Sequence, residues 1–149
     1  MESTGFSRPP AVVLDTNAVL DWLVFRHPSC AAWSTWLQAG SVRWLSSLAM
    51  RSELSHVLGR GIGAAWAPDL DGLWAAWDRH ATTVEPAPML GAATRVRCTD
   101  PDDQVFVELA LGHGARWLIS RDKALLKLAR RVRPLGLQVL TPEQWSPAG

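Results

Sequence analysis

Apolar residues recur along the chain with two different spacings. Short apolar runs, typical of buried strands, predict strands at VVLD (12–15), VRWLS (42–46), TTVEP (82–86), RWLIS (116–120) and the start of LQVLTPEQW (137–145). Apolar residues three or four positions apart predict helices over 17–25, 29–39, 47–58, 64–79, the segment after TDPDDQ, and 123–132. Pro68 disturbs the fourth of these helices, and TPEQW predicts a short terminal helix.

This alternation of strands and helices indicates an α/β fold with a central, mostly parallel β-sheet. A chain of 149 residues fits one domain with its own core, so we expect a single domain over 1–149, with residues 1–10 as a flexible N-terminal segment. In such sheets ligands bind beyond the carboxyl ends of the strands. Asp15 lies at one such end, and Asp122 follows another.

Composition and charge narrow the class of protein. The formal net charge of +1 does not mark the whole chain as a nucleic-acid binder, but residues 121–133 hold six basic residues and one acid. Cys30 and Cys98 stand far apart, which argues against a disulfide framework or a zinc site and fits a reducing compartment. Without an apolar run long enough for a signal or a membrane span, we expect a soluble, cytoplasmic protein with no membrane partner.

Tryptophan is unusually abundant, with nine residues and no tyrosine. Trp33 and Trp36, like Trp74 and Trp77, are three positions apart and are expected to share a helix face. Most of these side chains should pack in the core. Nine indoles are many for one small core, so some should lie at a subunit or partner interface, and we expect a homo-oligomer, a dimer being the simplest.

Several carboxylates are candidates for chemistry. Asp15 should be deeply placed, and a buried carboxylate must be paired or bind a metal. Glu53 falls about 60° from the apolar stripe of its helix, so it borders the buried face, as an ordinary boundary residue also would. In TDPDDQ, Asp100 can cap a helix that begins at Pro101 and carries Asp102 and Asp103 in its first turn; Asp122 can cap the next helix.

Capping and metal binding are compatible, because a carboxylate has several lone-pair sites. Two carboxylates about 4 Å apart repel by roughly 4 kcal/mol at an effective dielectric constant near 20. Four in one pocket would need a divalent cation, and oxygen ligands favour Mg²⁺ or Mn²⁺ over zinc. The natural chemistry of such a centre is hydrolysis of a phosphodiester by activated water.

The chain resembles the PIN-domain nucleases over almost its whole length. The matching stretches are VVLDTNAVL, SSLAMRSELSHVL, DPDDQVFVELALGHGARWLISRDKALL and GLQVLTPEQW. The third is the most specific, because it joins an acidic helix start to a strand ending in Ser-Arg-Asp at the spacing of the family. The branch it looks most like is described as the toxin components of toxin–antitoxin systems.

This resemblance implies roles for individual residues. The acidic quartet of the family carries over to Asp15, Glu53, Asp103 and Asp122 as catalytic residues and metal ligands, with Asp100 as an additional acid of this branch. Thr16 and Asn17 match polar residues after the first acid, and Ser120 matches a Ser/Thr position near the fourth. The resemblance implies that these three residues contact the substrate. The family implies a Rossmann-like three-layer sandwich, Mg²⁺ or Mn²⁺ as cofactor, an RNA substrate and a protein antitoxin as partner.

The basic segment has two interpretations. Its cationic side chains lie opposite an apolar stripe of Leu125, Leu128, Ala129 and Val132, as on any solvated helix face. The functional interpretation is a track for RNA phosphates beside Asp122, formed by Arg121, Lys123, Lys127, Arg130 and Arg131.

Two alternative functions remain open. A phosphatase of the haloacid-dehalogenase type also uses an Asp at the end of its first strand, but it needs a second Asp where this chain has Asn17. A catalytically inactive PIN module that binds RNA or protein would need no acids, and the intact acidic set argues against it.

Overall fold

The computed structural model describes residues 8–147, which form a five-stranded parallel sheet. The strand order is β3-β2-β1-β4-β5, and each neighbouring pair is parallel. Of the predicted flexible segment, residues 1–7 lie outside the described residues, whereas the carbonyl groups of Pro9 and Pro10 accept hydrogen bonds from Arg43. The strands are β1 (Ala11–Leu14), β2 (Arg43–Ser46), β3 (Ala81–Thr83), β4 (Trp117–Ile119) and β5 (Gln138–Leu140).

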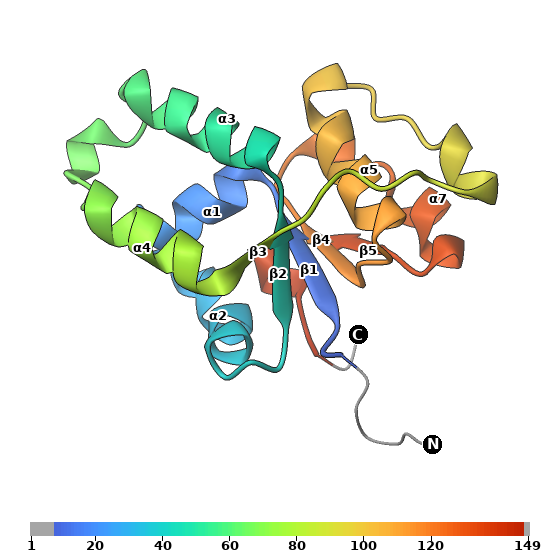
Figure 1. The fold of residues 1–149 in the computed structure, drawn as a ribbon, viewed down its shortest axis with the longest axis horizontal. Helices are drawn as coiled ribbons and strands as arrows, with labels where there is room; N and C mark the ends of the chain where they lie inside the picture. The colour runs from blue at the N-terminus through green and yellow to red at the C-terminus, as the bar shows by residue number, and fades with distance from the viewer. Residues whose placement is uncertain (1–7, 148–149) are drawn as a thin grey trace.

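Helices cover the sheet, which confirms the predicted three-layer α/β fold. In Figure 1, α1, α2 and α4 lie on one side of the strands, and α5 and α7 lie on the other. No helix of the described part is long and apolar enough to cross a membrane. The helices are α1 (Thr16–Leu23), α2 (Ala31–Gln38), α3 (Leu48–Gly59), α4 (Leu70–His80), α5 (Gln104–Gly112), α6 (Lys123–Leu126) and α7 (Ala129–Val132).

The central strand β1 fixes the position of the first acid. All four of its residues are buried, as expected for a strand with neighbours on both sides and helices on both faces. Leu14 pairs with Ile119 of β4, and the amide of Asp15 donates to the carbonyl of Ile119. The residues that follow β1 and β4 therefore emerge side by side at the carboxyl edge of the sheet.

Two predicted helices are interrupted. The segment predicted over 64–79 is a 3₁₀ turn, η2 (Ala64–Trp66), followed by a break and then α4, because Ala67 is left-handed and Pro68 follows it. The basic helix predicted over 123–132 is divided into α6 and α7. Between them the amide of Leu128 bonds to Leu125, three residues back, which tightens one turn while Leu125, Leu128 and Val132 stay buried.

Other boundaries move by a few residues. The third strand occupies residues 81–83 rather than 82–86, and the predicted terminal helix is a 3₁₀ turn, η6 (Pro142–Gln144). The helix predicted in TDPDDQVFVELALGHG begins with a 3₁₀ turn, η4 (Pro101–Asp103), which α5 follows. The remaining short turns are η1 (Pro28–Cys30), η3 (Gly91–Arg95) and η5 (Arg133–Leu135).

Most of the tryptophans pack in the core, as predicted. Trp33, Trp44, Trp77, Trp117 and Trp145 are buried, and edge-to-face contacts join Trp22 to Trp33 and Trp44, and Trp77 to Trp44 and Trp74. Trp33 and Trp36 lie three positions apart on α2, as predicted, but Trp36 is 42% exposed. The most exposed indole, at 62%, belongs to Trp66.

A glycine near the end of α5 allows a close approach of the chain. A Cβ added at Gly112 would meet the carbonyl oxygen of Ala87 at 2.5 Å, whereas a Cβ at Gly59 in α3 would meet nothing within 4 Å. The segment that includes Ala87 is also bound to the end of α5 by a hydrogen bond of 2.6 Å between Nε2 of His113 and the carbonyl of Glu85.

We therefore expect Gly112→Ala and Gly59→Ala to have opposite effects. A methyl group pressed against backbone costs roughly 1–3 kcal/mol, while Gly→Ala in an open helical position gains roughly 0.5–1 kcal/mol. Thermal or urea unfolding of both variants measures the difference. Equal stabilities for the two variants would contradict the close packing of residues 84–90 on α5.

Candidate metal centre at the carboxyl edge of the sheet

Asp15 is a buried carboxylate that both begins a helix and faces the next strand end. One of its oxygens accepts from the amide of Ala18 at 2.7 Å, as the N-cap of α1, and the other accepts from the hydroxyl of Ser120. Burial raises the pKa of Asp15 to about 6, against these two hydrogen bonds, which lower it. This group is the deepest of the predicted acids, with 3% of its surface exposed.

Ser120 joins two of the acids. Its hydroxyl donates to Asp15 and accepts from the amide of Asp122 at 2.9 Å. Asp122 in turn caps α6 by accepting from the amide of Ala124 at 2.8 Å. Since Ser120 is fully buried, we assign it to positioning the two acids rather than to the substrate contact implied by the resemblance.

Asp122 also belongs to a cluster of three carboxylates. Oxygens of Asp100, Asp103 and Asp122 lie within 4.8 Å of one another. Asp100 caps η4 through the amide of Asp102, at 3.0 Å, as the sequence predicts. The first turns of two helices, η4–α5 and α6, thus bring acids to one point.

Asp103 offers a carboxylate oxygen that no protein group within residues 8–147 satisfies. Its Oδ2 is buried and has no hydrogen-bond partner among the described residues. Burial, followed by the negative charges of Asp122 and Asp100, raises the pKa of Asp103 to about 7. A buried, unpaired carboxylate oxygen among other carboxylates is costly unless a cation or a proton satisfies it.

The donor set fits a hard divalent cation. Three carboxylates offer only oxygen ligands, which Mg²⁺ and Mn²⁺ prefer. Asp15 is not part of the closest cluster. Its negative charge nevertheless helps to raise the pKa of Asp103, and the charge of Asp122 helps to raise the pKa of Asp15. Asp15 therefore lies at the margin of the same centre.

Glu53 is linked to the centre through its neighbour. It lies half-buried on α3, as predicted for a boundary position, and accepts a hydrogen bond from the hydroxyl of Thr16, the residue after Asp15. The structure does not bring Glu53 into the cluster of three carboxylates, although the resemblance implies it as a fourth ligand. Thr16 is thus occupied in holding Glu53.

Arg121 is exposed, but its guanidinium is paired with acids of other elements. Its guanidinium contacts Asp21 at 2.9 Å, Glu143 at 2.7 Å and the hydroxyl of Ser29 at 2.8 Å. These contacts tie the loop between β4 and α6 to α1, η1 and η6, and the contact of Arg121 with RNA stays a prediction. Asn17, Lys123 and Lys127 are exposed, as a contact with substrate requires.

Sequence reasoning missed Gln104, which supports the acidic turn. Its side chain accepts from the amide of Cys98 at 2.6 Å and donates to the carbonyl of Val96 at 3.1 Å. These two bonds fix the segment that leads into Asp100. A glutamine at the first position of α5 gives no periodic signal, so only the folded chain shows its partners.

The raised pKa of Asp103 predicts how stability depends on pH without metal. Because the folded protein keeps a proton on Asp103 up to about pH 7, and an unfolded chain keeps it only to about 3.8, stability falls as the pH rises between these values. Asp103→Asn should remove part of this loss, so it should melt higher than wild type in EDTA at pH 8 and gain less from Mn²⁺. Differential scanning fluorimetry at pH 5 and pH 8 measures both effects.

Asp102→Asn is the matched control for this experiment. Asp102 is exposed in the same turn, so its substitution removes the same charge from the helix start, a cost of roughly 0.3–1 kcal/mol, without touching the cluster. If Mn²⁺ raises the melting temperatures of Asp103→Asn and wild type equally, Asp103 is not a metal ligand and serves only the start of the helix. The ligand set would then rest on Asp100 and Asp122.

Comparison with known protein families identifies the family of this chain. The family model described as PIN domain matches residues 11–124, which include Asp15, Glu53, Asp100, Asp103 and Asp122. No curated protein matches the chain. PIN domains are generally nucleases and typically bind divalent metals, in keeping with the acidic cluster at the ends of the strands. This chain belongs to the PIN-domain family.

Proposed function

We propose that the protein is a Mg²⁺- or Mn²⁺-dependent endoribonuclease that hydrolyses phosphodiester bonds of RNA. The observation that carries this proposal is the buried, unpartnered oxygen of Asp103 beside Asp100 and Asp122 in a PIN-domain fold. The membership in the family also sets aside the phosphatase alternative.

Asp100, Asp103 and Asp122 would hold the cation, with Asp15 at the margin of the site and Glu53, bound to Thr16, outside the cluster of three. A divalent cation bound there would supply Lewis-acid activation of water and stabilise charge on the phosphate. Ser120 keeps the Asp15 carboxylate oriented, and Thr16 keeps Glu53 oriented. These internal hydrogen bonds reduce the reorganisation of the two side chains when a cation binds.

Exposed groups around the centre would bind the RNA strand. Asn17 lies two residues after Asp15. Lys123 is the first residue of α6, which Asp122 caps, and Lys127 follows the last residue of that helix. Cations near the acids offset the repulsion between the phosphates and the carboxylates. Arg121 contributes indirectly, because its ion pairs hold the loop that carries Asp122.

Asp15→Asn and Asp122→Asn should each lower RNA cleavage about a hundredfold or more, a loss of roughly 2.7 kcal/mol in transition-state stabilisation. Asparagine caps a helix nearly as well as aspartate, so both variants should fold. Asp69→Asn is the matched control, because Asp69 caps α4 through the amide of Gly72 and is not among the acids of this site. The assay is cleavage of labelled RNA with Mg²⁺, with Mn²⁺ and with EDTA.

Wild-type cleavage in either site variant would refute the assignment of the catalytic acids. Cleavage that continues in EDTA would refute the dependence on metal. If the wild-type protein binds RNA but does not cleave it under any of these conditions, the alternative of an inactive RNA-binding module is favoured.

We also propose the finer assignment to the toxins of toxin–antitoxin systems, with a protein antitoxin and a dimeric state. The segment that joins α3 to the start of α4 supports association: Ile62, Trp66 and Leu70, four positions apart in the sequence, are each more than 40% exposed, and Trp66 packs on Phe25 with ring centroids 5.3 Å apart. Large apolar side chains exposed together are typical of interaction sites.

Trp66→Ser should weaken this association. Light scattering of wild type should give the mass of a dimer, and the variant should give a lower mean mass at equal concentration. Leu90→Ser is the control, since Leu90 is 78% exposed but belongs to a different segment. A wild-type monomer would contradict the dimer, and failure to co-purify with the product of an adjacent reading frame would count against an antitoxin.

A further inference from the structure

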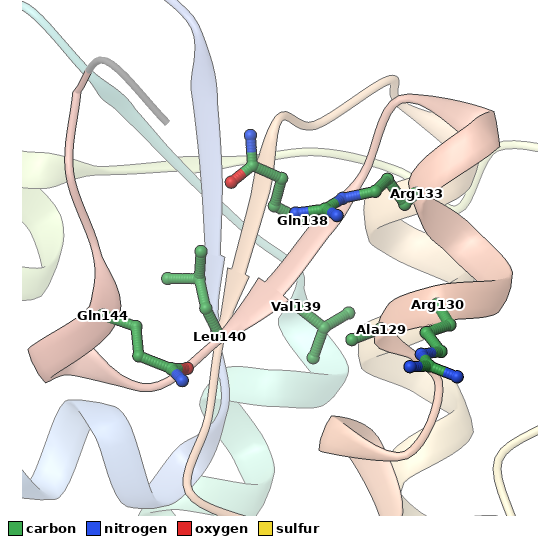
Figure 2. Close-up of a pocket in the computed structure, with 7 residues that line it drawn as sticks. All are labelled: Ala129, Arg130, Arg133, Gln138, Val139, Leu140 and Gln144. Atoms are coloured by element: carbon green, nitrogen blue, oxygen red, sulfur yellow. The ribbon is translucent and has the colours of Figure 1, made fainter.

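A second polar site lies at the free edge of the sheet. Strand β5 ends the strand order, and a cavity of about 360 Å³ opens against it. This volume is in the range of ligand-binding pockets. Figure 2 shows its lining residues, which are Ala129, Arg130, Arg133, Gln138, Val139, Leu140 and Gln144.

The charge of this pocket is entirely positive. Arg130 and Arg133 are exposed, and no acid lines the cavity. Within residues 8–147 neither guanidinium has an ion pair or a hydrogen bond to another side chain, in contrast to Arg121, which has two carboxylate partners. Unpaired guanidinium groups beside a cavity are typical of sites for phosphate.

Neutral donors complete the lining. The side-chain oxygen of Gln144 accepts from the amide of Thr141 at 3.0 Å, which leaves its NH₂ group available as a donor. Gln138 donates its backbone amide to Arg116, and Leu140 accepts from the amide of Ser120, so both face β4. In a parallel ladder the residue between them, Val139, directs its N–H and C=O to the open side of the strand.

The pocket is connected to the metal centre through a row of cations. The carbonyl of Leu140 bonds to Ser120, which contacts both Asp15 and Asp122. Three exposed cations follow Asp122 along the chain: Lys123 on α6, Lys127 between α6 and α7, and Arg130 on α7. A single strand that passes the acids and follows these cations reaches the pocket.

We propose that the pocket between α7 and β5 binds the sugar–phosphate backbone of the RNA substrate, at nucleotides flanking the bond that is cleaved. This inference rests on the proposed ribonuclease function and names where the rest of the substrate lies. Arg130 and Arg133 bind phosphate oxygens, and Gln144 with the edge of β5 offers hydrogen bonds to ribose hydroxyl groups. Residues 125–144, which hold the whole pocket, follow the part of the chain that matches the family model.

The test measures binding without cleavage. A labelled single-stranded RNA of about 12 nucleotides, within the usual range of single-strand site sizes, is titrated into Asp15→Asn protein with Mg²⁺ present, by fluorescence anisotropy. In that background Arg130→Gln/Arg133→Gln should weaken binding about tenfold. The slope of log K against log salt should fall by about 1.4, because each single-strand phosphate contact contributes about 0.7.

Arg60→Gln/Arg79→Gln is the matched control. Both of its arginines are exposed on α3–α4, and it removes the same charge. Equal losses of affinity and of salt slope in the two double variants would refute RNA binding in the pocket. The losses would then reflect only the lower positive charge of the whole protein. Displacement of the RNA by AMP or inorganic phosphate at micromolar concentration, with the effect lost in the pocket variant, would assign the site to a free phosphate ligand instead.

These outcomes are independent of the nuclease assignment. RNA binding that depends on the pocket in a protein that cleaves nothing would contradict the proposed function and retain the site. Cleavage that depends on the acids, with no effect of the pocket variant on binding, would retain the proposed function and contradict the pocket as a binding site. Because both arginines are exposed, thermal melts should show that the double variant is folded.

Discussion

The accumulation of negative charge at the carboxyl edge of the sheet is the constraint on which the site depends. Parallel strands β1 and β4 end side by side, and the chain places an acid after each, with two more acids arriving from the start of α5. Apposed carboxylates at about 4 Å repel by roughly 4 kcal/mol at an effective dielectric constant near 20. The fold must therefore supply compensation, and protons or a cation must complete it.

Part of the compensation comes from helix termini. Asp15, Asp100 and Asp122 each accept a backbone amide at the first turn of α1, η4 or α6. The positive ends of these turns favour negative charge, so capping and the assembly of a metal site use the same geometry. Asp103 lacks such a bond and has an unpartnered oxygen, and burial, followed by the charges of Asp122 and Asp100, raises its pKa to about 7.

The sequence predicted the layers, the parallel sheet and most of the acids, because each depends on local pattern: apolar runs for strands, caps for helix starts. It did not predict the partners of Arg121 or of Glu53, which come from residues 22 to 100 positions away. The basic segment shows the same limit. Its apolar stripe gave the correct buried face, but a tightened turn at Leu128 divides the helix and directs Arg130 and Arg133 to the pocket beside β5.

The central claim is that the clustered acids form one cation site, and proton release on metal binding tests it most directly. Calorimetric titration with Mn²⁺ in buffers of different ionisation enthalpy gives the number of protons released. With the pKa of Asp103 at about 7 and that of Asp15 at about 6, binding at pH 6 should release about one proton, and release should nearly vanish at pH 8. Mn²⁺ binding without proton release at pH 6, or no binding at pH 8, would contradict the account.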